Sequence, residues 1–142
     1  IRHYKQSNTQ LNIMNKIIVE VSVGELLDKI SILEIKQEKI KDQDKLGFVN
    51  LEHKILKDQL NKNVKTDEKL ENLFQSLKDI NAKLWVIEDD KRQCEKDKDF
   101  GEKFIKLSRD VHFLNDDRAK IKLEMNNHTG SKIKEIKEYT SY

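Results

Sequence analysis

The sequence predicts an all-α fold: an antiparallel bundle of about four helices, with a long hairpin of the third and fourth helices and a short extended N-terminal segment. Proline is absent and glycine occurs 4 times in 142 residues, so little interrupts a helix. Charged residues make up 38% of the chain and their signs alternate, as on solvent-exposed helices. Apolar residues recur every three or four positions through most of the sequence, which is the period of a helix face.

A single helical domain is expected over residues 14–142, preceded by a segment without a regular apolar pattern. Residues 1–13 follow neither a helical nor a strand period. We therefore predict that Met14 is the natural start and that residues 1–13 are disordered or a non-native leader. Apolar residues then alternate in "KIIVEVS", residues 16–22, which predicts a short strand. It could pair with the C-terminal tail or another chain, or lie extended on the bundle.

Two helices are predicted in the first half of the chain. Ser22 has the character of an N-cap, and Glu25 lies three residues further on, where a capping box requires it. This helix is expected to end near Asp42. A shorter second helix is expected over about residues 46–61. Its buried line consists of Val49, His53, Leu56 and Leu60.

The third and fourth helices are predicted to form an antiparallel hairpin, because only a short segment separates them. Thr66 or Asp67 is expected to cap the third helix and Asp99 the fourth, which should end at Asn127 or Gly130. The third helix has the most regular apolar pattern in the chain. Its heptad line consists of Leu70, Leu73, Leu77, Ile80, Leu84 and Ile87.

Polar residues are expected to flank this hairpin in two strips, one on each helix. Arg118 falls on the apolar stripe of the fourth helix, and a buried arginine needs a carboxylate or a ligand. One interpretation is salt bridging between the helices, with Glu88 and Asp89 pairing with Arg109 and its neighbours. The other is a half-buried polar network that fixes how a partner helix aligns with this hairpin, or that binds a small anion. The candidate residues are Trp85, Glu88, Asp89, Arg92, Arg109, Asn115, Asp116 and Arg118.

No familiar catalytic or metal-binding pattern is complete. The "DFG" of residues 99–101 lacks the glycine-rich and catalytic loops of a kinase, and the 4 histidines are scattered. Two acidic pairs, Glu68 with Glu71 and Glu88 with Asp89, lie on one predicted helix about 25–30 Å apart, too far to share an ion. "GELLDKISILE" is somewhat like the first helix of chorismate mutases, but Leu27 stands where an arginine is needed. We expect no catalytic residue, metal or cofactor.

The charge and the apolar content of the chain limit which classes of partner and which cellular compartment we expect. The 28 basic and 26 acidic residues nearly cancel, and only four of the basic residues are arginine, which argues against nucleic-acid binding. The longest apolar run is four residues, so no membrane span is expected. The one cysteine, Cys94, fits a reducing compartment. We expect a soluble, cytoplasmic protein.

Several blocks together resemble a bacterial domain family of unknown function, whose members are short all-helical proteins. The blocks are "VSVGELLDKISILEIKQEKI", "NAKLWVIEDDKR", "KDFGEKFIKLSRDVHFLNDDRAKIK" and "GSKIKEIKEYTSY". The resemblance covers most of residues 16–142 and implies no activity. It implies a shared structural or binding role for Glu25, Asp28, Lys29, Trp85, Glu88, Asp89, Asn115, Asp116 and Arg118. Lys91 and the ending "KEYTSY" depart from the pattern that the resemblance leads us to expect.

The leading functional interpretation is a non-enzymatic interaction or oligomerisation module that contains a coiled coil. It would form a homodimer or bind another helical protein, because we expect one short chain to leave part of the narrow heptad seam of the third helix uncovered. The alternative is a protein that binds a small anion or metabolite, or an all-α enzyme of chorismate-mutase-like type. The sequence identifies neither the ligand nor the partner.

Overall fold

The computed structural model describes residues 15–142 and contains four helices. They are α2 (Val23–Lys39), α3 (Gln43–Asn63), α4 (Glu68–Asp97) and α5 (Glu102–Thr129). The predicted all-α class is therefore confirmed. The leader predicted over residues 1–13 and the start predicted at Met14 lie outside the described residues.

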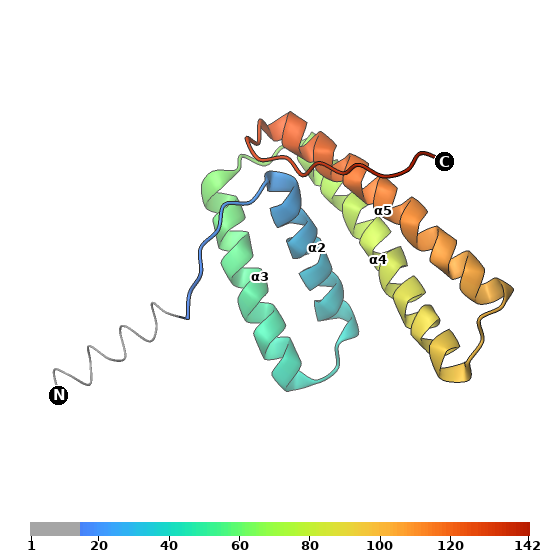
Figure 1. The fold of residues 1–142 in the computed structure, drawn as a ribbon. Coiled ribbons are helices and arrows are strands. Elements are labelled where there is room, and N and C mark those ends of the chain that lie inside the picture. Colours follow the sequence, from blue (N-terminus) through green and yellow to red (C-terminus); the bar gives the residue numbers. More distant parts are fainter. Residues whose placement is uncertain (1–14) are drawn as a thin grey trace.

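The four helices form two hairpins, α2 with α3 and α4 with α5 (Figure 1). α2 also packs against both α4 and α5, so it lies in the middle of the molecule. Backbone contacts join α3 to α2 but not to α4 or α5. The hairpins lie close together where α2 begins and diverge toward their other ends. After α5 the C-terminal tail turns back and runs along that helix.

Short polar residues mark the starts of α2 and α4, as predicted. The Ser22 hydroxyl accepts a hydrogen bond from the backbone N–H of Glu25 at 3.1 Å. The Asp67 carboxylate does the same for the N–H of Leu70 at 2.8 Å. Each cap satisfies one of the backbone donors that the first turn of a helix leaves without an intrahelical partner.

Two boundary predictions are wrong. α2 ends at Lys39, before Asp42, because the Asp42 carboxylate caps α3 instead and starts that helix earlier than expected. Asp99 does not cap α5, whose N-cap is Gly101 without a side-chain hydrogen bond. The Asp99 carboxylate accepts from the backbone N–H of Gly101 at 3.1 Å, because an aspartate in a tight turn bonds readily to the backbone two residues on.

The heptad line of α4 supplies the middle of the core. Its leucines at positions 70, 77 and 84 are buried, and its other members are half-buried. All four helices contribute to the buried cluster, which contains Leu27, Ile30, Leu60, Leu70, Leu77 and Met125. The seam that motivated the expected homodimer is thus covered largely by the chain's own helices.

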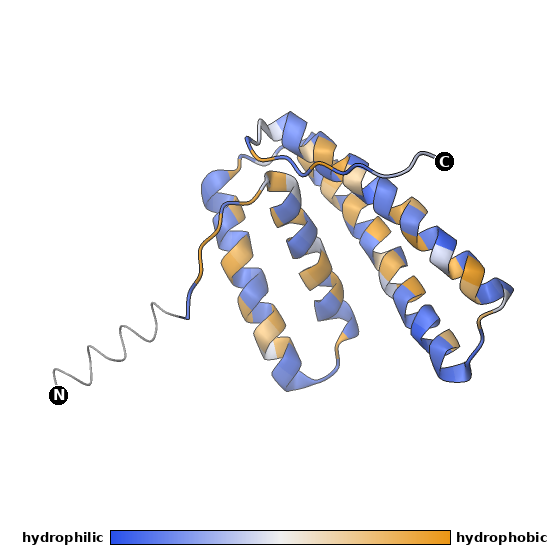
Figure 2. Cartoon of the chain, viewed as in Figure 1, coloured by the Kyte–Doolittle hydropathy of each residue, from blue (hydrophilic) through white to orange (hydrophobic). Residues whose placement is uncertain are grey.

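The predicted strand in residues 16–22 does not form. These residues precede α2 without strand pairing, and Figure 2 shows this mostly apolar segment leading to the start of α2. Ile17 is 87% exposed and Ile18 is 82% exposed. A strand needs a neighbour for its backbone hydrogen bonds, and the described residues provide none.

Candidate functional site

Asn81 of α4 links three helices although it is only 4% exposed. Its Nδ2 donates to Asp28 Oδ1 and to Ser31 Oγ on α2, both at 2.8 Å. Its Oδ1 accepts from Nη1 of Arg118 on α5 at 3.3 Å. An amide carries both donors and an acceptor, so this one side chain can serve a carboxylate and a guanidinium together. Asn81 therefore positions Arg118 relative to α2.

Lys122 on α5 forms a second buried polar centre one helical turn after Arg118. Its Nζ lies 2.8 Å from a carboxylate oxygen of Glu25, 3.1 Å from one of Glu135 and 3.7 Å from one of Asp28. Burial lowers the pKa of Lys122, but the hydrogen bonds to the two glutamates and the charge of Asp28 outweigh burial, so the pKa lies above its ordinary value. The lysine stays charged and ties α2 and the tail to α5.

The first turn of α2 lies directly against the end of α5. The backbone N–H of Gly24 donates to Asn126 Oδ1 at 2.7 Å, and the N–H of Val23 donates to Ser131 Oγ at 3.3 Å. These bonds satisfy backbone donors that a helix start leaves unpaired. Without a side chain at Gly24 the two helices can approach this closely.

A cavity of about 340 Å³ lies between α2, α4 and α5, next to Asn81. Apolar side chains of Ile32, Ile35 and Leu84 form much of its wall. Five of the eight predicted cluster residues also line it: Trp85, Glu88, Asp89, Arg92 and Arg118. The structure thus brings these five together around one hollow.

The other three predicted residues lie outside the lining of this cavity. Arg109 is exposed, with its guanidinium 5.9 Å from the ring centroid of Phe113. Asn115 is half-buried, and Asp116 accepts a hydrogen bond from the hydroxyl of Tyr142 in the tail. The suggested pairing with Glu88 and Asp89 does not occur, because Arg109 forms no ion pair with any described carboxylate.

Sequence reasoning missed most of the buried polar network. The signal that could have found it is a regular spacing of polar or small residues beside the apolar stripes. On α5 such residues recur every four positions, and on α2 they recur after four and then three. They are Arg118, Lys122 and Asn126 on α5, and Gly24, Asp28 and Ser31 on α2.

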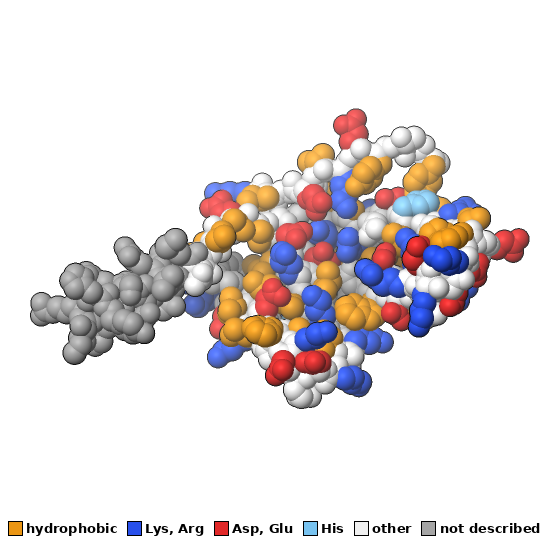
Figure 3. All heavy atoms as spheres, turned by 60° about the horizontal axis from the view of Figure 1, so that its bottom comes forward, with side chains coloured by type: hydrophobic (Ala, Val, Ile, Leu, Met, Phe, Trp, Pro, Cys, Tyr) orange, Lys and Arg blue, Asp and Glu red, His pale blue; other side chains and the backbone are white. Residues whose placement is uncertain are grey.

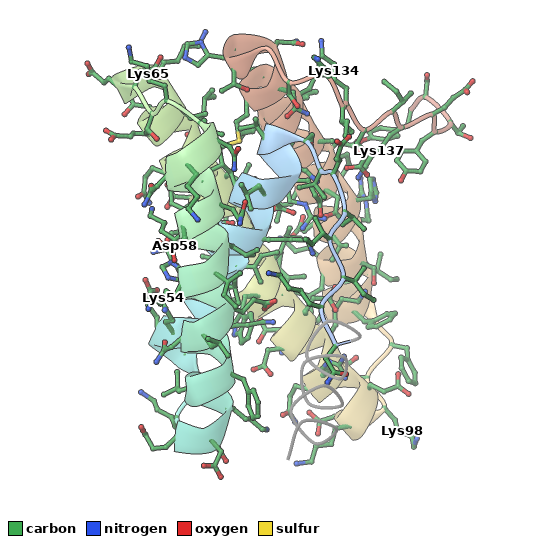
Figure 4. All side chains as sticks on the ribbon, turned by 90° about the vertical axis from the view of Figure 1, so that its left-hand side faces the viewer. Lys54, Asp58, Lys65, Lys98, Lys134 and Lys137 are labelled. Carbon is green, nitrogen blue, oxygen red and sulfur yellow. The ribbon has the colours of Figure 1, made fainter. Side chains whose placement is uncertain are left out.

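The outer side of α3 carries a second regular pattern, which we call the α3 stripe. Its members alternate spacings of four and three, as the contact positions of a coiled coil do. Its apolar members are strongly exposed: Phe48 by 77%, Leu51 by 57% and Ile55 by 52%. The α3 stripe consists of Asp44, Phe48, Leu51, Ile55, Asp58 and Lys62. Figure 4 shows Lys54 and Asp58 pointing outward from this side of α3.

Other kinds of site find no support in the part of the chain that the structure describes. No three His, Cys, Asp or Glu side chains in residues 15–142 gather closely enough to hold a metal ion. On the face shown in Figure 3, acidic and basic side chains intermingle and form no one-sided basic surface. Within the same residues, no helix combines the length and apolarity needed to cross a membrane.

Comparison with known proteins gives a family but no activity. The search of curated proteins and the search of solved structures both find no match. A model of the "Family of unknown function (DUF6165)" matches residues 17–142, which include all four helices and the cavity between them. The chain therefore belongs to this family, for which no activity is established.

Proposed function

We propose that the protein is an interaction module that forms a homodimer through the α3 stripe. The observation that carries this proposal is the row of exposed Phe48, Leu51 and Ile55 on a helix whose backbone approaches only that of α2. Single exposed apolar residues are ordinary, but three at coiled-coil spacing on an uncovered helix are typical of an interface. The module would act in the cytoplasm, where its free Cys94 remains reduced.

The charges on the α3 stripe favour a second copy of this chain in antiparallel orientation. Asp44 lies in the first turn of α3 and Lys62 in its last turn. When two α3 helices lie antiparallel about a two-fold axis, Asp44 faces the partner's Lys62 and Leu51 faces the partner's Ile55. Phe48 then faces the partner's Asp58, whose carboxylate can turn toward solvent. A parallel pair would instead place Asp44 against its own copy.

The first experiment asks whether the α3 stripe drives self-association. We expect light scattering after gel filtration to give a dimer at micromolar concentration, and Leu51→Glu to give a monomer with unchanged helical circular dichroism. The glutamate would place a charge in the apolar middle of the interface. Lys57→Glu is the matched control, because residue 57 is also exposed on α3 but off the α3 stripe. A wild-type monomer at these concentrations would contradict the proposal.

The second experiment tests the antiparallel register. Asp44→Lys should weaken the dimer by placing two lysines opposite each other, and the double variant Asp44→Lys, Lys62→Asp should restore it. Within one chain these residues lie at opposite ends of α3, about 27 Å apart at 1.5 Å per residue. Rescue therefore reports a contact between copies. Equal weakening in the single and double variants would rule out this register, and thermal melts would correct for changes in helix stability.

A further inference from the structure

We infer that the cavity between α2, α4 and α5 binds a small organic anion: one carboxylate or phosphate group attached to an apolar body about the size of a single ring. This goes beyond the proposed dimerisation and uses a different part of the molecule. The cavity is lined by α2, α4 and α5, whereas the α3 stripe lies on the outer side of α3.

The wall of the cavity combines an apolar area with a few polar groups, the usual composition of a ligand site. Ile32 and Ile35 come from α2, and Leu84 and Trp85 come from α4. Its volume of about 340 Å³ lies at the small end of the range for ligand pockets. An apolar group the size of one ring would cover these side chains, which a bare inorganic anion would leave in contact with water.

Arg118 supplies the charge that selects an anion. Asn81 holds its guanidinium through one hydrogen bond, and Asn81 is itself fixed by two hydrogen bonds to α2. A guanidinium has five N–H donors, so most remain free for a carboxylate or a phosphate. Arg118 is half-buried and forms no ion pair with a carboxylate of the described residues.

Three of the nearby carboxylates contact a different cation. Glu25, Asp28 and Glu135 surround Lys122, one turn further along α5. These three carboxylates therefore contact Lys122 and form no ion pair with Arg118, whose charge acts on Glu135 only at longer range. A ligand anion could complete the coordination of Arg118 in the way that these three side chains complete that of Lys122.

The exposed charges at the cavity limit the ligand further. Arg92 adds a second cation, whereas Glu88 and Asp89 add two carboxylates, and all three are exposed. A ligand with one acidic group can approach Arg118, but a second acidic group elsewhere on the ligand would face these carboxylates and be repelled. The lining therefore favours one acidic group on an otherwise apolar or hydrogen-bonding body.

The single tryptophan makes the binding directly measurable, because Trp85 lines the cavity and no other tryptophan contributes fluorescence. The probes are benzoate and phenyl phosphate, with benzyl alcohol and inorganic phosphate as controls. We expect benzoate, phenyl phosphate or both to change the Trp85 emission saturably at millimolar concentration, and the stronger probe identifies the preferred acidic group. We expect each control to bind at least tenfold more weakly. Binding should weaken as salt concentration rises.

Two matched variants test the role of Arg118. Arg118→Gln should weaken probe binding at least tenfold. Arg109→Gln should leave it unchanged, because Arg109 lies outside the cavity lining. Equal binding of benzyl alcohol and benzoate would overturn the proposal, as would the absence of saturation by either anionic probe. These wild-type measurements decide the matter even if Arg118→Gln fails to fold.

The Leu51→Glu monomer should bind the probes as well as wild type, so failure of dimerisation and failure of ligand binding can be told apart.

Discussion

Gly24 lies where the backbones of α2 and α5 approach closely. A Cβ atom added at this position would lie 2.7 Å from the backbone oxygen of Lys122 and 3.0 Å from the side-chain oxygen of Asn126. A backbone oxygen inside a helix cannot move away without shifting the helix. The same glycine donates its N–H to Asn126, so its substitution would also disturb that hydrogen bond.

The two helical glycines should therefore respond in opposite directions to alanine. Gly24→Ala should lower the free energy of unfolding by about 1–3 kcal/mol, because it overpacks the contact between α2 and α5. Gly47→Ala should raise it by about 0.5–1 kcal/mol, since nothing lies within 4 Å of its added Cβ and alanine favours a helix. Urea unfolding followed by circular dichroism measures both. Equal effects would show that the close approach at Gly24 is unimportant.

Asn81 is the residue on which the buried polar network depends most. Asn81→Ala would leave Asp28, Ser31 and Arg118 without their shared partner, and each buried polar group left unpaired costs about 1–3 kcal/mol. Ser31 keeps its hydrogen bond to the Asp28 backbone and Asp28 keeps its contact with Lys122, so we expect a loss of about 1–3 kcal/mol in the same unfolding experiment. Asn72→Ala, at an exposed position of α4, should change stability by about 0.5 kcal/mol or less. A small effect at both positions would contradict the central role of Asn81.

Among the elements, the C-terminal tail is held to α5 by charge. Hydrogen bonding to Lys122, followed by the charge of that lysine, keeps the pKa of Glu135 below its ordinary value of 4.5. A carboxyl whose pKa is lowered by docking stabilises the docked state above the ordinary pKa. That contribution disappears as the pH falls through the lower, docked value. The tail should therefore stay attached at neutral pH and detach in acid.

Nuclear magnetic resonance can follow this detachment through the amide signals of residues 133–142. The signals should be constant from pH 7 to about pH 5 and should move toward those of a free peptide at pH values below 4.5. Glu135→Gln should weaken attachment already at neutral pH, whereas Glu138→Gln, which alters an exposed tail residue, should not. If acid affected the Glu135→Gln protein and the wild type equally, another carboxyl would be responsible.

The helices were predictable from sequence wherever one apolar face dominates. The line of Leu70, Leu77 and Leu84 identified α4, and Ser22 and Asp67 identified two helix starts. α2 was harder to interpret because it contacts three helices and buries polar residues such as Ser31 as completely as apolar ones. Periodicity finds the apolar stripe of a helix but does not show which polar residues a third helix will cover.

The candidate site was predictable only in part, for a related reason. Arg118 stood out because it interrupts an apolar stripe, and Trp85 and its neighbours stood out as one polar strip on α4. Whether a given side chain reaches the same hollow depends on how α4 and α5 rotate against α2. That rotation excludes Arg109 from the lining and places Ile32 and Ile35 there, and no spacing within one helix determines it.

In the whole molecule, the helix arrangement places the cavity and the α3 stripe on separate surfaces. α2 packs against all three other helices, and the cavity lies among α2, α4 and α5, which pack against one another. The outer side of α3 faces solvent. The hydrogen bonds of Gly24 and Asn81 hold α2 against α5 and α4 on the cavity side. A dimer through the α3 stripe would leave the cavity open to solvent, so the two proposed activities can coexist.

The link between Gly24 and Asn126 also bears on how the chain folds. The two residues are 102 positions apart, whereas each hairpin is built from neighbours in sequence. Local contacts form quickly and distant ones slowly, so we expect both hairpins to form before they dock. During synthesis from the N-terminus, α2 emerges long before α5. α2 is therefore exposed to water until α4 and α5 have been synthesised. Its polar residues Asp28 and Ser31 can be hydrated during this time, although both are buried in the folded protein.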